Sequence, residues 1–221
     1  MSTRKKRIGV VLSGCGYLDG AEIHEAVCGL LALDRAGAEV HCFAPDIEFD
    51  VVDHRTKKPT GERRNCLTEA ARIARGRIRD IAEADVAQID GLLLPGGFGA
   101  AKNLCNFATE GSDCSVHEGV AALLHAVHDA GKPIAAVCIA PALLARLFGS
   151  KHPSLTIGDD EGTARELEKL GARHVKCPVD DCVIDRDLKI VTAPAYMFDT
   201  WTASIEKGIT AAVAALLSMC D

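Results

Sequence analysis

The sequence lacks any long apolar run. No stretch approaches the roughly 18–20 continuous apolar residues that a membrane span requires, so we expect no membrane insertion. The opening residues, MSTRKKRIGVVLSG, place only a short apolar run after a basic head. That run is too short for a secretory signal peptide, and no small-residue cleavage site follows it. We therefore expect a cytoplasmic protein.

Signatures of metal binding and of disulfides are also lacking. The chain has ten cysteines, but no two have C-x-x-C spacing and no compact Cys/His cluster occurs. In a chain of 221 residues without a secretion signal, we expect reduced thiols, no metal and no other cofactor. The net charge is −6, and the basic residues have few aromatic residues among them. This charge pattern argues against nucleic-acid binding.

Short apolar runs alternate with longer segments of helical periodicity. We expect strands over 7–14, 38–45, 89–97, 132–138, 155–160 and 174–179, helices over 22–37, 66–78, 115–131, 140–149, 162–171 and 198–218, and a hairpin over 182–194. This alternation, with solidly apolar strands, is typical of an α/β sandwich with a mainly parallel central sheet. Residues 46–66 are polar around a turn and predict an inserted hairpin, so residues 1–221 form one domain.

The stretch IAAVCIAP (134–141) ends a buried strand on a cysteine. In an α/β sheet, ligands bind outside the carboxyl ends of the strands. A nucleophile at a strand-to-helix turn is held out of the sheet, and a helix N-terminus lowers the pKa of a thiol. The pattern therefore predicts an activated thiol at Cys138. A buried cysteine that only packs is the alternative.

A pair of glycines follows another predicted strand in LLLPGGFG (92–99). Gly96 and Gly97 let the backbone approach a ligand closely and present N–H groups to it. The N–H groups of Gly97 and Ile139 together form a predicted oxyanion hole for an intermediate on Cys138. A tight turn that requires positive φ is the alternative explanation of the glycines.

Two acidic residues lie at the start of the predicted helix over 22–37. Glu25 lies on or beside the apolar stripe of this helix, where an unpaired charge is costly to bury. It is therefore either a satisfied structural partner or a functional carboxylate. Glu22 is better explained as a negative charge that stabilises the helix N-terminus.

Two other polar residues follow predicted strands. Cys15 is expected near the same pocket, either as a second thiol or as a small residue that lines it. Asn103, shortly after the glycine pair, either positions the substrate or caps a short helix. The residues themselves do not separate these alternatives.

Taken together, several stretches resemble the ThiJ/PfpI superfamily, and more closely its ElbB-like glyoxalase branch. They are IGVVLSGCGYLDGAEIHEAV, LLLPGGFGAAKNL, AAVCIAPALL and CPVDDCVIDRDLKIVTAPAYM. The resemblance implies a flavodoxin-like three-layer sandwich of the class I glutamine amidotransferase type. It also implies that Cys138 is the elbow nucleophile, that Glu25 hydrogen-bonds this thiol, and that Gly97 and Ile139 are the backbone donors.

The chain departs from parts of this superfamily. Protease-like members carry a histidine directly after the cysteine, where this chain has Ile139, and amidotransferases carry His-Pro-Glu where it reads APAY (193–196). Peptide and amide hydrolysis therefore lack the base that activates the thiol. His152 is a later candidate, but it precedes a proline in a predicted loop and is not favoured. Solvated helix faces explain the histidines at positions 24, 117, 125 and 128.

The residues and the resemblance together predict a cofactor-independent glyoxalase. Cys138 adds to a small 1,2-dicarbonyl such as glyoxal, Glu25 moves the carbon-bound proton, and water releases glycolate. The same chemistry on glycated thiols or amines would be a deglycase activity. The alternative is a non-catalytic redox-sensing or regulatory binding protein in which Cys138 is oxidised. The resemblance further implies a homodimer and a link to isoprenoid biosynthesis.

Overall fold

The computed structural model describes residues 4–220 and is built around a seven-stranded sheet. The strand order is β10-β11-β7-β6-β1-β2-β5, and every neighbouring pair is parallel except β10 with β11. The strands are β1 (Arg7–Val11), β2 (Glu39–Ala44), β5 (Ile78–Asp80), β6 (Gly91–Leu94), β7 (Ile134–Val137), β10 (Val183–Asp185) and β11 (Ile190–Ala193). The predicted α/β sandwich with a mainly parallel sheet is confirmed.

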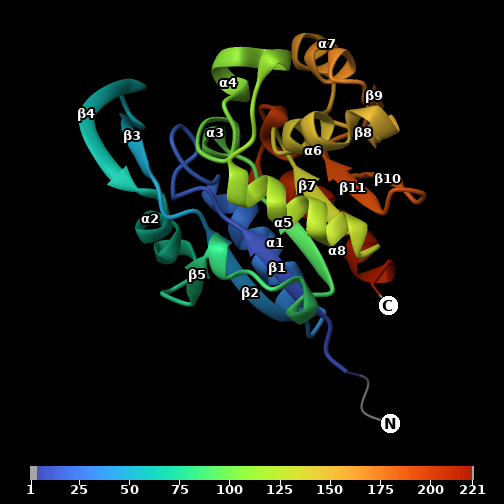
Figure 1. Ribbon diagram of the computed structural model, residues 1–221. Helices are drawn as coiled ribbons and strands as arrows, with labels where there is room; N and C mark the ends of the chain where they lie inside the picture. The colour runs from blue at the N-terminus through green and yellow to red at the C-terminus, as the bar shows by residue number, and fades with distance from the viewer. Residues whose placement is uncertain (1–3, 221) are drawn as a thin grey trace.

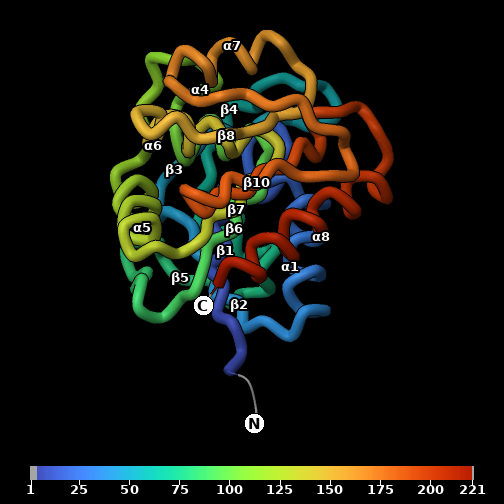
Figure 2. Tube along the Cα trace, turned by 90° about the vertical axis from the view of Figure 1, so that its right-hand side faces the viewer, coloured from blue at the N-terminus to red at the C-terminus, as the bar shows by residue number. Residues whose placement is uncertain are grey.

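Helices cover both faces of this sheet, as Figure 2 shows with α5 and α6 on one side and α1 and α8 on the other. One hydrophobic cluster lies beneath α1 (Ile23–Arg35), α2 (Cys66–Ile73) and α8 (Thr202–Ser218). The other lies beneath α3 (Phe98–Lys102), α4 (Phe107–Glu110), α5 (Glu118–Asp129), α6 (Pro141–Phe148) and α7 (Glu161–Lys169). All residues of β6, β7 and β11 are buried, because a strand covered on both faces has no solvent side.

Residues 46–66 form the predicted hairpin. Its strands β3 (Glu48–Asp53) and β4 (Lys58–Asn65) are antiparallel and pair only with each other. Figure 1 shows this ribbon curving away from the main body beside α2. Most of β4 is exposed, which explains why the segment is polar and shows no strand-like apolar alternation.

Three predicted segments differ from the structure. The helix expected over 66–78 ends at Ile73, because Arg75 (φ 53°) and Gly76 (φ 78°) adopt left-handed backbone conformations. Ile78, the last residue of the predicted helix, instead begins the edge strand β5. The strands expected over 155–160 and 174–179 are reduced to β8 (Ser154–Leu155) and β9 (Arg173–His174), which pair only with each other.

Short 3-10 helices connect several of these elements. They are η1 (Ile81–Glu83), η2 (Val86–Gln88), η3 (Gly111–Asp113), η4 (Gly149–Lys151) and η5 (Ala195–Met197). No helix within residues 4–220 is long and apolar enough to cross a membrane. The strands β1, β6, β7 and β11 are neighbours in the sheet, so their carboxyl ends bring four loops together at one edge.

Candidate active site

Cys138 lies at a sharp turn between β7 and α6. Its φ of 59° is in the left-handed region, which is strained for a residue with a Cβ. Its backbone N–H donates to the carbonyl oxygen of Ala193 at 2.9 Å, which fixes the turn against the end of β11. The residue is 7 % exposed. A strained, constrained turn of this kind is typical of a nucleophile elbow.

Glu25 reaches the same point from the first turn of α1 and is only 1 % exposed. Its Oε2 accepts a hydrogen bond from the N–H of Gly96 at 2.9 Å, and its Oε1 accepts one from the N–H of Tyr196 at 3.1 Å. The carboxyl is also hydrogen-bonded to the thiol of Cys138. Three loops therefore converge on this carboxyl, and the contact predicted between Glu25 and Cys138 is present.

The glycine pair allows this convergence. A Cβ on Gly96 would lie 2.5 Å from the Cβ of Cys138 and 2.8 Å from Oε2 of Glu25. Gly97 has φ 90°, and a Cβ there would lie 2.4 Å from the backbone N of Glu22. Both explanations of the glycines, close approach and positive φ, therefore apply. The N–H groups of Gly97 and Ile139 donate to the sulfur of Cys138, which places the two predicted donors together.

Burial dominates the electrostatics of the pair. Burial, followed by the charge of Glu22, raises the pKa of Glu25 from 4.5 to about 8, although hydrogen bonds from Tyr196, Cys138 and Gly96 lower it. Burial, followed by the charge of Glu25, also raises the pKa of the Cys138 thiol well above 9.0. The lowered thiol pKa expected from the helix N-terminus is wrong, because loss of solvent outweighs the backbone donors. Burial therefore favours the protonated form of both groups.

Glu22 is the N-cap of α1. Its Oε2 accepts a hydrogen bond from the N–H of Glu25 at 2.7 Å, so it satisfies a backbone donor that the helix leaves free. The backbone N–H of Glu22 donates to the carbonyl oxygen of Gly96 at 2.9 Å. Glu22 therefore has the structural position predicted for it, and it acts on Glu25 through its charge.

Cys15 lies in the loop that follows β1, and Asn103 supports that loop. The charges that act on Cys15 are those of Glu69 and Arg72 on α2 and of Asp19 in its own loop, so Cys15 lies near α2. Asn103 is the C-cap of α3, and its side-chain amide donates to the carbonyl oxygens of Ser13 and Asp19, both at 2.8 Å. Of the two roles considered for Asn103, these contacts favour the structural one.

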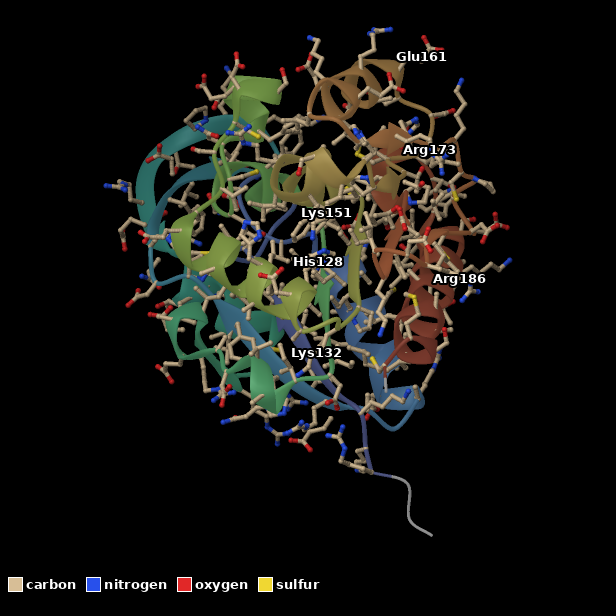
Figure 3. All side chains as sticks on the ribbon, turned by 45° about the vertical axis from the view of Figure 1, so that its right-hand side comes forward. His128, Lys132, Lys151, Glu161, Arg173 and Arg186 are labelled. Carbon is tan, nitrogen blue, oxygen red and sulfur yellow. The ribbon has the colours of Figure 1, made fainter. Side chains whose placement is uncertain are left out.

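His152 lies at the far end of α6 from Cys138. It caps η4 with a left-handed backbone, and its Nδ1 is hydrogen-bonded to the carbonyl oxygen of Gly171 at 2.9 Å. It lines a separate surface hollow of about 490 Å³ with Lys151, Arg173 and Arg186; Figure 3 labels these three basic residues. His152 is therefore not a partner of the candidate nucleophile, as the sequence indicated.

The sequence did not identify Tyr196 and His24 as residues of the site. The hydroxyl of Tyr196 is hydrogen-bonded to Nδ1 of His24 at 2.8 Å and to Oγ1 of Thr202 at 3.0 Å. The solvated face assigned to His24 is incomplete as an explanation, since this exposed ring also has a hydrogen-bonded partner at the site. The contribution of Tyr196 to Glu25 comes from a backbone N–H, so its residue type gave no signal.

The chain is similar to several known proteins. The DJ-1/PfpI family profile matches residues 15–205. The human protein named glutamine amidotransferase-like class 1 domain-containing protein 3, mitochondrial, is 45 % identical over 96 % of this chain and 83 % of its own length. The crystal structure of an isoprenoid biosynthesis protein with an amidotransferase-like domain, from Ehrlichia chaffeensis, has a TM-score of 0.89. It is 37 % identical and covers 96 % of this chain and 99 % of its own.

A glyoxalase III from Candida albicans shares the fold, with a TM-score of 0.64, 14 % identity and coverage of 98 % of each chain. Three curated relatives, the human protein among them, carry the word mitochondrial in their names. The expectation of a cytoplasmic protein, which rested on composition and on the lack of a secretory signal, is therefore wrong. Neither feature reports on mitochondrial location.

The close packing of Gly96 gives the first prediction. Gly96→Ala places a methyl group against both Cys138 and Glu25, so the two side chains must separate. We expect the rate of Cys138 alkylation by iodoacetamide to change at least about tenfold, since about 1.4 kcal/mol is enough for that change and overpacking typically costs about 1–3 kcal/mol. Peptide mass spectrometry measures the rate. Gly162→Ala, where a Cβ has ordinary space, is the matched control, and equal rates in both variants would contradict the prediction.

The raised pKa of Glu25 gives a pH dependence of stability. The folded state keeps a proton up to about pH 8 that the unfolded chain loses near pH 4.5. This contribution to stability is full below the unfolded pKa and is lost as pH rises through the folded one. Glutamine does not titrate, so the wild type should lose roughly 3 kcal/mol of free energy of unfolding relative to Glu25→Gln as the pH rises from 5 to 8. Urea unfolding measures this difference, and a pH-independent difference would contradict it.

Proposed function

The chain belongs to the DJ-1/PfpI family, and on that basis we propose that it is a cofactor-independent glyoxalase that converts glyoxal and water to glycolate. The observation that carries the proposal is the buried hydrogen bond between Cys138 and Glu25, with the N–H groups of Gly97 and Ile139 on the sulfur. This arrangement supplies a nucleophile, a proton carrier and two backbone donors. The glyoxalase III fold match supports the proposal at the level of architecture.

The first step is addition of the sulfur to one aldehyde carbon. Because Cys138 rests as a thiol, it must lose its proton as the carbon–sulfur bond forms, and the ionised fraction of Glu25 accepts that proton. The aldehyde oxygen becomes an oxyanion, which the N–H groups of Gly97 and Ile139 stabilise as the sulfur leaves them. Glu25 then returns the proton to that oxygen, which gives a hemithioacetal and leaves the carboxylate free to act as a base again.

The second step moves a proton between the two carbons. Glu25 removes the hydrogen from the carbon that carries sulfur, which gives an enediol, and returns a proton to the neighbouring carbon. The product is a thioester of glycolic acid on Cys138. Water cleaves this thioester to glycolate and restores the thiol, so the overall change adds one water and no oxidant or reductant. A carboxyl with a pKa of about 8 is suited to carry this proton in both directions near neutral pH.

The site favours a small substrate. Cys138 is only 7 % exposed, so few atoms can reach the sulfur at once. Glycated thiols and amines present the same carbon skeleton, and a deglycase activity on small adducts would use the same steps. The residue after the nucleophile is Ile139, so the proposal does not extend to peptide hydrolysis.

A redox-sensing role is the second candidate function. The raised pKa of Glu25 leaves a carboxylic O–H beside the sulfur at neutral pH. Such a donor would stabilise a sulfinate oxygen after oxidation of Cys138 by peroxide. The same two residues therefore support either role, and only turnover separates them.

We also propose that the protein is a homodimer, because α1 carries an exposed row of apolar side chains that a second copy could cover. Ile23, Val27 and Leu31 lie four residues apart and are 43 %, 49 % and 39 % exposed, so they share one face of the helix. A link to isoprenoid biosynthesis is supported by the name of the Ehrlichia chaffeensis protein.

The proposed reaction predicts distinct effects of two substitutions. Cys138→Ser should abolish glycolate formation from glyoxal, because a hydroxyl ionises far less readily than a thiol. Glu25→Gln should lower turnover about 10²–10⁴-fold, the usual contribution of a general acid–base group, while an adduct on Cys138 still forms. Chromatography of glycolate measures the turnover of both variants, and intact-protein mass detects the adduct on Cys138 in Glu25→Gln.

Cys182→Ser, at a partly buried cysteine in the loop after β9, is the matched control and should retain full turnover. Wild-type turnover by Glu25→Gln would contradict the proton shuttle. Peroxide-dependent mass gain on Cys138 in a wild-type protein that forms no glycolate would favour the redox sensor over the glyoxalase.

A further inference from the structure

Residues 194–196 form a turn that brings a backbone amide to Glu25 from near the end of the chain. The N–H of Tyr196 donates to Oε1 of Glu25 at 3.1 Å. The preceding residue, Ala195, is fully buried and has φ 45°. This left-handed conformation is strained for any residue with a Cβ, and it persists only where surrounding contacts hold it.

The hydroxyl of Tyr196 supplies contacts that hold the turn. It is hydrogen-bonded to Nδ1 of His24 on α1 at 2.8 Å and to Oγ1 of Thr202 on α8 at 3.0 Å. The rings of His24 and Tyr196 also contact each other, with centroids 5.8 Å apart. A single side chain therefore ties the strained turn to two of the helices on this face of the sheet, α1 and α8.

The two ends of Tyr196 contact consecutive residues of α1. Its hydroxyl is bonded to His24, and its backbone N–H is bonded to Glu25. If the hydroxyl contacts were lost, the strained backbone at Ala195 would be free to relax, and the amide would move away from the carboxyl. The bond to Glu25 thus depends on contacts made at the opposite end of the same residue.

We infer that Tyr196 is a positioning residue for Glu25. The hydroxyl of Tyr196, held by His24 and Thr202, keeps the strained 194–196 turn closed and keeps the Tyr196 amide hydrogen-bonded to the carboxyl of Glu25. This inference rests on the proposed function, in which Glu25 carries the proton of the reaction. A proton carrier must keep a fixed orientation and a fixed proton affinity.

The effect on proton affinity has a definite sign. Burial and the charge of Glu22 raise the pKa of Glu25, and the amide of Tyr196 is the largest of the contacts that lower it. The titratable groups that act on Glu25 are Glu22, from α1, and Cys138, from the turn after β7. Loss of the Tyr196 amide leaves burial less opposed, so the pKa of Glu25 must rise.

Tyr196→Phe tests the inference, because it removes the hydroxyl and keeps the ring and the amide. The carboxyl band of Glu25, isolated by infrared difference spectra against Glu25→Gln, should titrate about one pH unit higher than in wild type, the size expected when a hydrogen bond to a charged group is lost. Adding Ala195→Gly should bring the midpoint back toward wild type. Glycine adopts positive φ without strain, so the turn then needs no hydroxyl to stay closed.

Tyr17→Phe is the matched control. Tyr17 is the other tyrosine of the chain, its ring packs edge-on against His54, and its loss of a hydroxyl should leave the titration unchanged. A wild-type midpoint in Tyr196→Phe, or no return after Ala195→Gly, would overturn the inference. Thermal unfolding verifies that each variant is folded.

This titration needs no substrate, so it separates the inference from the proposed function. A protein that forms no glycolate but shows the shifted midpoint and its return would contradict the glyoxalase and leave the positioning role standing. Normal glycolate formation with an unshifted midpoint would contradict the positioning role alone.

Discussion

The site depends on one buried hydrogen bond, between the thiol of Cys138 and the carboxyl of Glu25. Two acidic groups in contact away from solvent cannot both ionise readily, because each negative charge opposes the other and neither has water to stabilise it. The surrounding backbone offsets part of this penalty, since Gly96 and Tyr196 donate to the carboxyl and Gly97 and Ile139 donate to the sulfur. The result is a pair in which burial favours the protonated form of both groups.

Backbone geometry makes that bond possible. Cys138 and Ala195 both adopt left-handed conformations without being glycine, and both lie where a strand of the central sheet ends. Gly96 has no Cβ because any side chain there would separate the sulfur from the carboxylate. Backbone strain and a glycine without a side chain would weaken an ordinary loop, and both are concentrated here around Cys138 and Glu25.

Much of this arrangement was predictable from the sequence. The apolar runs and helical periodicity gave the layered sheet, and the cysteine and paired glycines at strand ends marked the turn around Cys138. Glu25 stood out as a carboxylate on an apolar helix face. Proton affinities were not predictable, because desolvation depends on everything that packs around a group, and the sign of the thiol shift was therefore wrong.

The remaining failures also have physical causes. Tyr196 contacts Glu25 through a backbone N–H, which every residue except proline possesses, so the sequence did not reveal this contact. The edge strand β5 has three residues, too few to show a periodicity within a segment that otherwise has a helical pattern. Location in the cell leaves no trace in core packing, and only relatives corrected it.

The order of the strands in the sheet determines when the turn around Cys138 can form during synthesis of the chain. Glu25 and Tyr196 are 171 positions apart, and β11, which ends beside them, pairs with β7 in the middle of the sheet. While the ribosome is still making the last quarter of the polypeptide, the nascent chain carries Cys138 without the strand that fixes its turn. Long-range closure of this kind is slow relative to local helix formation, so the site around Cys138 is completed only after synthesis is all but finished.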